Sequence, residues 1–216
     1  SYGPSAPSAA SNSVTPIPVI GDAFGGGFFA GQIGVSGVAT HNLVVGPVAS
    51  AQAGTTLKYK NVNTATAGAD SDIDGPQNTA DIVADGNSTV YPAGHFCNDL
   101  VVGGFSDWYL PAQNELEVCY YNLKPTTTAG SDANDTSSGI NPNAVPARAS
   151  NYVASGPPNQ TTATDFQTTG AEDFSPLFYW SSSEISATTS RSQNFAYGRQ
   201  YSNNKTVLRR VRAIRR

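Results

Sequence analysis

Charged side chains are scarce in this sequence and methionine is absent. Charged residues make up 13% of the 216-residue chain, about half of the usual quarter, whereas Ser, Thr, Asn, Gly and Ala are abundant. Hydroxyl and amide groups, more than ions, should therefore hydrate the surface. No run of 18 apolar residues is present, which argues against a membrane span. Since the sequence has no initiator methionine, we expect Ser1 to be a processing boundary or the first ordered residue of a longer chain.

Cysteine and histidine are also rare. Two cysteines, Cys97 and Cys119, and two histidines, His41 and His95, are scattered along the chain without the spacing of zinc ligands. A single disulfide between the cysteines is compatible with the sequence, but so are two separate buried thiols that pack as small apolar groups. Both interpretations remain open at this stage.

Basic residues are concentrated at the end of a chain whose net charge is −4. Residues 1–184 hold 4 basic and 16 acidic side chains, and residues 185–216 hold 8 basic and no acidic ones. The basic end predicts either an anion-binding patch or arginines that pair with the carboxylates of the same domain. We favour pairing for Arg210 and Arg212, which occur in a strand-like alternation with apolar residues. An acidic chain without a basic helix argues against nucleic acid as a partner.

Composition divides the chain into an arm and one domain. Residues 1–19 are rich in Ser, Ala and Pro and are typical of an extended linker. One domain is expected over residues 20–216, and residues 125–175 within it form an elaborated polar loop region. The order of predicted elements indicates an α+β fold: strands near residues 28–30, 41–47 and 55–62, then helices, then strands at 177–184, 192–198 and 206–214.

Local signals refine these elements. Pro92 is expected in the first turn of a helix over residues 91–100, where its missing N–H costs little. Pro111 is expected to open a second helix with apolar residues at helical spacing. Asn203-Asn204 predicts the turn between the last two strands.

Several motifs occur together in a characteristic order. They are GGGFFAGQI, THNLVVGP, GPQNTADIV, CNDLVVGGFSDWYLPAQNELEVCYYNL, YWSSSE, QNFAYG and RVRAIR. In this combination the chain resembles the C-terminal domain of the Legionella collagen-like adhesin, which is also found in bacterial surface and phage tail proteins. The resemblance covers roughly residues 20–216 and is weakest over 125–175.

The resemblance implies a C-type-lectin-like fold, in which two helices pack on a twisted antiparallel sheet beside a long loop region. It implies adhesion at a virion or cell surface, with a host receptor or glycan as partner and a homotrimer as the favoured assembly. The Legionella member implies sulfated-glycan binding. A purely structural cap of a fibre is the alternative, and a polysaccharide hydrolase ranks last.

Between YWSSSE and RVRAIR lies a segment rich in Tyr, Asn and Arg. Such residues are enriched at binding faces, because Tyr offers rigid contact area and Arg a fork for anionic groups. A solvated hairpin of the same composition is the alternative. The predicted ligand-binding residues are Arg191, Gln193, Asn194, Tyr197, Arg199, Gln200, Tyr201, Asn203 and Asn204.

An acidic loop resembles the opening of a calcium site. Asp70, Asp72 and Asp74 alternate before Gly75, and Asp81 stands where a bidentate Glu is usual. The alternative is an Asp/Gly turn that leads into a helix. Otherwise no cofactor is expected.

No catalytic site is expected. The hydroxyls of residues 181–183 lack a nucleophile elbow and a nearby His, and we expect them to bond to backbone groups. Glu115 and Glu117 are two apart on a predicted helix and do not form a pair for glycoside hydrolysis, and Glu184 is expected in an internal hydrogen bond.

The packing of both tryptophans and one buried ion pair are also predicted. Trp108 and Trp180 are predicted to pack in the interior. Asp107 is predicted to be buried and paired with Arg212 or Arg210, because buried charges need partners.

Overall fold

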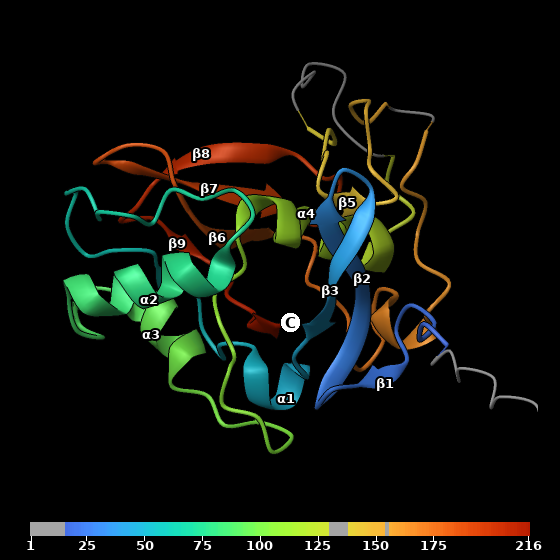
Figure 1. Cartoon of the computed structure of the whole chain (residues 1–216), viewed down its shortest axis with the longest axis horizontal. Helices are drawn as coiled ribbons and strands as arrows, with labels where there is room; N and C mark the ends of the chain where they lie inside the picture. The colour runs from blue at the N-terminus through green and yellow to red at the C-terminus, as the bar shows by residue number, and fades with distance from the viewer. Residues whose placement is uncertain (1–15, 130–137, 154–155) are drawn as a thin grey trace, which may run out of the picture.

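The computed structural model describes residues 16–129, 138–153 and 156–216. This part of the chain is α+β, with three antiparallel sheets and four α-helices (Figure 1). The predicted arm over residues 1–19 falls outside the described residues except for its last four. No helix in the described ranges has the length and apolar character needed to cross a membrane.

The largest sheet brings the two ends of the domain together. Its strand order is β1-β2-β3-β10, with β5 paired to β2, and every pairing is antiparallel. Glycine allows helix α4 (Gln113–Leu123) to approach this sheet closely, because a Cβ on Gly31 (φ 124°) would lie 2.3 Å from Nδ2 of Asn122. The strands are Ala23–Phe24 (β1), Gly27–Val35 (β2), Val38–Val45 (β3), Ala144–Val145 (β5) and Ile214–Arg215 (β10).

A separate three-stranded sheet carries most of the predicted site. It consists of β6 (Phe178–Glu184), β7 (Thr189–Asn194) and β8 (Gln200–Asn204). Next to it, β4 (Leu57–Lys58) pairs with β9 (Leu208–Arg209). The predicted strand at 206–214 is therefore interrupted, since its middle residues bond to neighbouring segments instead of to one strand.

The predicted turn at Asn203-Asn204 is misplaced, because both residues belong to β8 and the turn that leads to β9 follows at residues 205–207, where the Val207 N–H donates to the Asn204 carbonyl at 3.1 Å. A further turn lies between Asn194 and Gln200, within the predicted strand 192–198. Oδ1 of Asn194 accepts a hydrogen bond from the Ala196 N–H at 2.8 Å, and Gly198 adopts φ 87°, a conformation that favours glycine.

Four helices are present among the described residues, where the fold that the resemblance implies has two. They are α1 (Val48–Ala51), α2 (Gly75–Asp85), α3 (Pro92–Asn98) and α4 (Gln113–Leu123), and a 3₁₀ turn covers Thr164–Phe166. Pro92 occupies the first turn of α3, as predicted. Helix α4 begins two residues after Pro111, where the Glu115 carboxylate accepts a hydrogen bond from the Ala112 N–H at 2.8 Å, as in half of a capping box.

Two adjoining clusters form the core. One joins α4 to the β2–β3 sheet, and the other surrounds Trp108 and Trp180, which are 2% and 1% exposed. The prediction that both tryptophans pack in the interior is confirmed. Cys119 lies in the first cluster and Cys97 in the second, and both are free thiols. The disulfide interpretation is therefore wrong.

The long loop region contributes to the core more than its sequence indicates. Tyr152, Phe166 and Phe174 are buried in the first cluster. Phe174 stacks on Phe195 at a centroid distance of 4.1 Å. Yellow to orange in Figure 1, the described parts of this region run along the side formed by β1, β2 and β5. The loop therefore forms a wall of the domain.

Candidate ligand-binding surface

The predicted ligand-binding residues divide into a buried and an exposed group. The buried members are Gln193, Asn194, Gln200 and Asn203, which are 1 to 8% exposed. Their side chains hold the hairpin together: Nε2 of Gln193 donates to the Gly198 carbonyl at 3.2 Å, and Oδ1 of Asn203 accepts from Oγ of Ser192 at 2.9 Å. Because their polar groups form hydrogen bonds within the hairpin, the structure does not support direct contact between these four side chains and a ligand.

The other five predicted residues reach the surface. Tyr201 is 44% exposed, Asn204 is exposed, and Arg191, Tyr197 and Arg199 are partly buried. Asn204 is engaged locally, since its Oδ1 accepts hydrogen bonds from the backbone N–H and the hydroxyl of Thr206.

An arginine–aromatic patch, consisting of Phe178, Arg199, Tyr201 and Arg209, forms on the β6–β8 sheet. The guanidinium of Arg199 lies 4.8 Å from the ring centroid of Tyr201. The Tyr201 ring contacts the Phe178 ring at 6.4 Å. The guanidinium of Arg209 in turn lies 5.0 Å from the Phe178 ring. Cations and rings thus alternate across the strands, an arrangement held by cation–π attraction.

A buried amide fixes one end of the patch. Nε of Arg209 donates to Oδ1 of Asn203 at 2.9 Å, and partial desolvation lowers the pKa of Arg209. Leu177 and Leu208 are 48% and 52% exposed and stand next to patch residues in the chain. The surface combines a preorganised guanidinium, two ring faces and apolar flanks, which suits a planar, apolar or anionic group of a ligand.

Sequence reasoning missed Phe178 and Arg209. Phe178 stands in the YWSSSE strand region, where aromatic residues were assigned to packing. Arg209 belongs to the basic end, for which an anion-binding patch and internal pairing were both open and pairing was favoured only for Arg210 and Arg212. Alternation could not have found Phe178, because it places Phe178 on the same face as Trp180, which lies in the core.

The carboxylates of the acidic loop are bonded to different partners and do not form one site. Asp74 caps α2, where its Oδ1 accepts from the Gln77 N–H at 3.2 Å, and it also pairs with Arg216 at 2.8 Å. Asp81 accepts from Nε2 of Gln77 at 3.0 Å. Desolvation raises the pKa of Asp72, and the positive charge of Arg191 opposes this rise.

Across the described ranges, no group of three or more His, Cys, Asp or Glu residues is arranged to hold a metal ion. Calcium binding by Asp70, Asp72, Asp74 and Asp81 therefore stays a prediction that the positions of these carboxylates do not favour.

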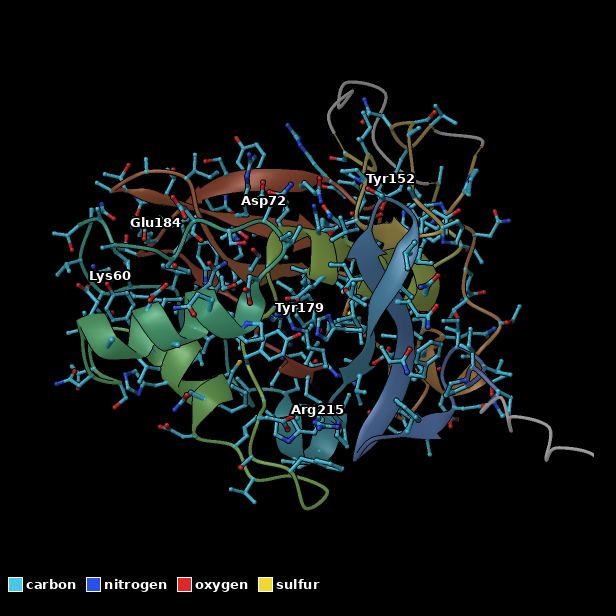
Figure 2. All side chains as sticks on the ribbon, in the orientation of Figure 1. Lys60, Asp72, Tyr152, Tyr179, Glu184 and Arg215 are labelled. Atoms are coloured by element: carbon cyan, nitrogen blue, oxygen red, sulfur yellow. The ribbon has the colours of Figure 1, made fainter. Side chains whose placement is uncertain are left out.

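Two buried lysines organise the loop that precedes the acidic residues. Nζ of Lys60 donates to the carbonyls of Thr64 and Ala65 at 3.2 and 3.1 Å. Nζ of Lys205 donates to the same Thr64 carbonyl at 2.8 Å and pairs with Glu184 at 2.6 Å. The prediction that Glu184 makes internal hydrogen bonds is confirmed, since it also accepts from the Thr66 N–H. Lys60 and Glu184 lie on the side of the molecule that holds α2 (Figure 2).

The prediction for Asp107 is wrong in both partner and burial. Asp107 pairs with Arg215 at 2.7 Å, and its side chain is 52% exposed. The buried Arg212 instead pairs with Glu172 at 2.7 Å. Arg212 and Arg215 are three residues apart in an extended segment, so their side chains point to opposite faces and lie in different surroundings.

The carboxylates and hydroxyls that were considered for catalysis form hydrogen bonds or ion pairs within the protein. Glu115 and Glu117 are 0% exposed. Glu115 accepts from Ala112 N–H and from the Tyr109 hydroxyl, while Glu117 pairs with Arg148. Oγ of Ser183 donates to the Ser71 carbonyl at 2.8 Å, which confirms the prediction of hydroxyl-to-backbone bonding.

Together, the fold and this surface describe a compact α+β module with an exposed arginine–aromatic patch. The family model of the Lcl C-terminal domain matches residues 63–215, and the chain belongs to this family. The family is one of surface adhesin-like modules. The match confirms the resemblance found in the sequence, although it begins after the β2–β3 hairpin rather than near residue 20. No curated protein and no solved structure matches the chain.

Proposed function

We propose that the chain is a non-catalytic recognition module with a C-type-lectin-like fold, displayed on a virion or cell surface, that binds a host receptor or glycan. The arginine–aromatic patch is the observation that carries this proposal. Its rings and guanidinium groups are held in place by one another and by Asn203. Residues fixed in this way lose little conformational entropy when a ligand binds.

Support for the fold assignment comes from the topology. A strand near the start of the described chain, β3, pairs with β10 near its end. Helices and the long loop region lie between them in the sequence, which agrees with the architecture that the family resemblance implies.

Support for a non-catalytic role comes from burial. Glu115 and Glu117 have no exposed surface, and the three serines that follow Trp180 are at most 1% exposed. A general acid or a nucleophile must reach its substrate, and these groups are already committed to internal hydrogen bonds.

Binding of the protein to host cells and to a glycan array tests this proposal. The unmodified chain is compared with an Arg199→Ala/Tyr201→Ala variant and with an Arg209→Ala variant. We expect both variants to fold with an unchanged far-UV circular dichroism spectrum and to lose at least tenfold in affinity. Val101→Ala is the control, because Val101 is 75% exposed and lies outside the patch. Full attachment by the patch variants would place the ligand site elsewhere, and turnover of a polysaccharide would favour a hydrolase.

A structural role in a homo-oligomeric fibre cap, with a trimer favoured, is the second candidate. The tip of the β2–β3 hairpin exposes Val35 and Val38, at 57% and 68%, and apolar tips of this kind favour contact with another chain. Light scattering after gel filtration tests this candidate. A Val35→Ser/Val38→Ser variant should shift a trimer toward the monomer, and an unchanged mass would remove the hairpin tip from the interface.

A further inference from the structure

None of the twelve basic residues of the chain is exposed. All twelve lie in the described ranges, and each is buried or partly buried. Acidic residues behave differently, since seven of them are exposed in the same ranges. The exposed acidic residues are Asp22, Asp70, Asp72, Asp85, Asp99, Asp107 and Asp165. Lys and Arg are ordinarily among the residues that stay at the surface, so this asymmetry is not a general property of charged side chains.

Three of the four lysines are held inside the domain. Lys60, Lys124 and Lys205 are 2%, 1% and 0% exposed. Nζ of Lys124 donates to the Pro158 carbonyl at 3.0 Å, and the other two ammonium groups share the Thr64 carbonyl. A side chain held in this way reaches another protein only after local unfolding of the segment that contains it.

Carboxylates and strand pairing hold several of the arginines. Nε of Arg148 donates to Oε1 of Glu117 at 3.0 Å, and Arg212, which is 2% exposed, pairs with Glu172 at 2.7 Å. Arg191 lies in β7, the middle strand of its sheet. Whether a protease cuts a segment depends on the burial and hydrogen bonding of its backbone, and both oppose cleavage at these arginines.

The loops, in contrast, carry almost no basic residues. Residues 61–123 and 149–190 contain neither Lys nor Arg, and Arg148 is the one basic residue of the long loop region, 125–175. This region nevertheless reaches the surface, because Val153 is 56% exposed. Exposed loop tips are the preferred sites of proteolytic nicking. The segments that a protease meets first are therefore those that lack a basic residue.

We propose that this placement of basic residues protects the displayed module from trypsin-like proteases, so that it persists in extracellular fluids that contain them. A trypsin-like protease cuts after Lys or Arg, because a carboxylate in its specificity pocket pairs with the basic side chain. Here the accessible loops offer no such side chain, and the basic residues stand where the backbone is folded. This protection is independent of the arginine–aromatic patch and holds whatever ligand the module binds.

Digestion of the folded chain with trypsin and with elastase, followed by intact-mass spectrometry, tests the proposal. Elastase accepts small apolar side chains in its specificity pocket, and the exposed Ala149 and Val153 offer them. We expect elastase to nick the long loop region, while trypsin leaves the segment from Lys58 to Arg209 in one piece. Trypsin should cut the folded chain about 100-fold more slowly than the urea-unfolded chain, with rates normalised to a peptide substrate, because only locally opened molecules are cut.

A pair of variants separates the placement of basic residues from general rigidity. Ser150 is exposed in the long loop region. Ser150→Arg therefore supplies a basic residue at an accessible position, and Ser150→Gln is the matched control. We expect trypsin to cut after residue 150 in the first variant and to leave the second intact.

Two results overturn the proposal. Rapid trypsin cleavage of the unmodified chain between Lys58 and Arg209 would show that the basic residues are accessible. Resistance of Ser150→Arg to trypsin, or of the long loop region to elastase, would show that the whole fold, and not the position of its basic residues, excludes proteases. Neither result bears on the arginine–aromatic patch, whose failure is seen in the attachment of its own variants.

Discussion

Arg212 and Glu172 form an ion pair of 2.7 Å that joins the RVRAIR segment to the long loop region. The Arg212 side chain is 1% exposed, and it also donates to the Gly46 carbonyl at 2.8 Å and to the Glu172 carbonyl at 2.9 Å. Its guanidinium lies 4.6 Å from the Phe174 ring. Burial lowers the pKa of Arg212 to about 10, against the opposing charge of Glu172. One arginine therefore connects the residue that follows β3, the long loop region and the core.

Removal of the Glu172 carboxylate should destabilise the domain strongly. Glu172→Ala leaves the Arg212 charge buried without its partner, and we expect a loss of about 3–5 kcal/mol in the free energy of unfolding. Urea denaturation monitored by tryptophan fluorescence measures this loss. Asp99→Ala is the control, since the Asp99 side chain is 63% exposed. A loss below 1 kcal/mol would show that water replaces the missing carboxylate.

The pair between Asp107 and Arg215 should matter much less. Its carboxylate is half exposed, and exposed ion pairs contribute up to about 1 kcal/mol. Asp107→Ala should therefore lower the free energy of unfolding by less than about 1 kcal/mol, an effect that shrinks further in 1 M salt. The same urea titration with and without salt checks both points. An effect as large as that of Glu172→Ala would contradict the observed exposure.

Stability should fall as pH rises through the range in which Glu115 ionises. Burial raises the pKa of Glu115 from 4.5 to about 7, although the Ala112 N–H and Arg216 oppose this rise. The folded state thus holds the proton more tightly than the unfolded state, so ionisation costs stability from about pH 4.5 upward and the loss is complete above pH 7. The expected loss is up to about 3 kcal/mol.

Urea titrations of wild type and Glu115→Gln between pH 4.5 and pH 8 measure this dependence. Other carboxylates titrate in both proteins, so the difference between the two curves isolates Glu115. We expect wild type to lose stability relative to the variant as pH rises. Parallel curves would assign the pH dependence to other groups.

Calcium should leave the thermal midpoint unchanged. The carbonyls of Thr64 and Ala65 are already occupied by the ammonium groups of Lys60 and Lys205, and Asp74 is committed to Arg216. A bound ion at a hundred times its dissociation constant would stabilise the fold by about 2.7 kcal/mol. Scanning calorimetry in millimolar calcium and in EDTA measures the midpoint of thermal unfolding. A higher midpoint in calcium would support calcium binding by the acidic loop.

Local patterns predicted the elements that depend on local interactions. Helix α4 follows from the helical spacing of Leu116, Cys119, Tyr120 and Leu123, which are all buried. The strand that contains Trp180 follows from its aromatic and apolar residues. In both cases the residue types and their spacing suffice, because neighbours in the sequence determine which side chains share a face.

Interactions between distant segments were not predictable in the same way. Asn203 was expected at an exposed turn, but it is buried because Ser192 and Arg209 supply donors from other strands. Arg212, and not its neighbour Arg215, enters the core because Glu172 lies opposite it. The alternation of RVRAIR places Arg212 and Arg215 on opposite faces, but it does not show which face meets which carboxylate, so partner assignment required the three-dimensional arrangement.

The pairing of β3 with β10 has a consequence for the order of events during synthesis. Val45 is paired with Ile214, so the first sheet stays incomplete until residue 214 has left the ribosome. Chains dominated by such distant pairings have high relative contact order and fold in milliseconds to seconds rather than microseconds. Until then the β2–β3 hairpin exposes an unpaired edge, and the nascent chain is open to capture by chaperones or by other nascent chains at that edge.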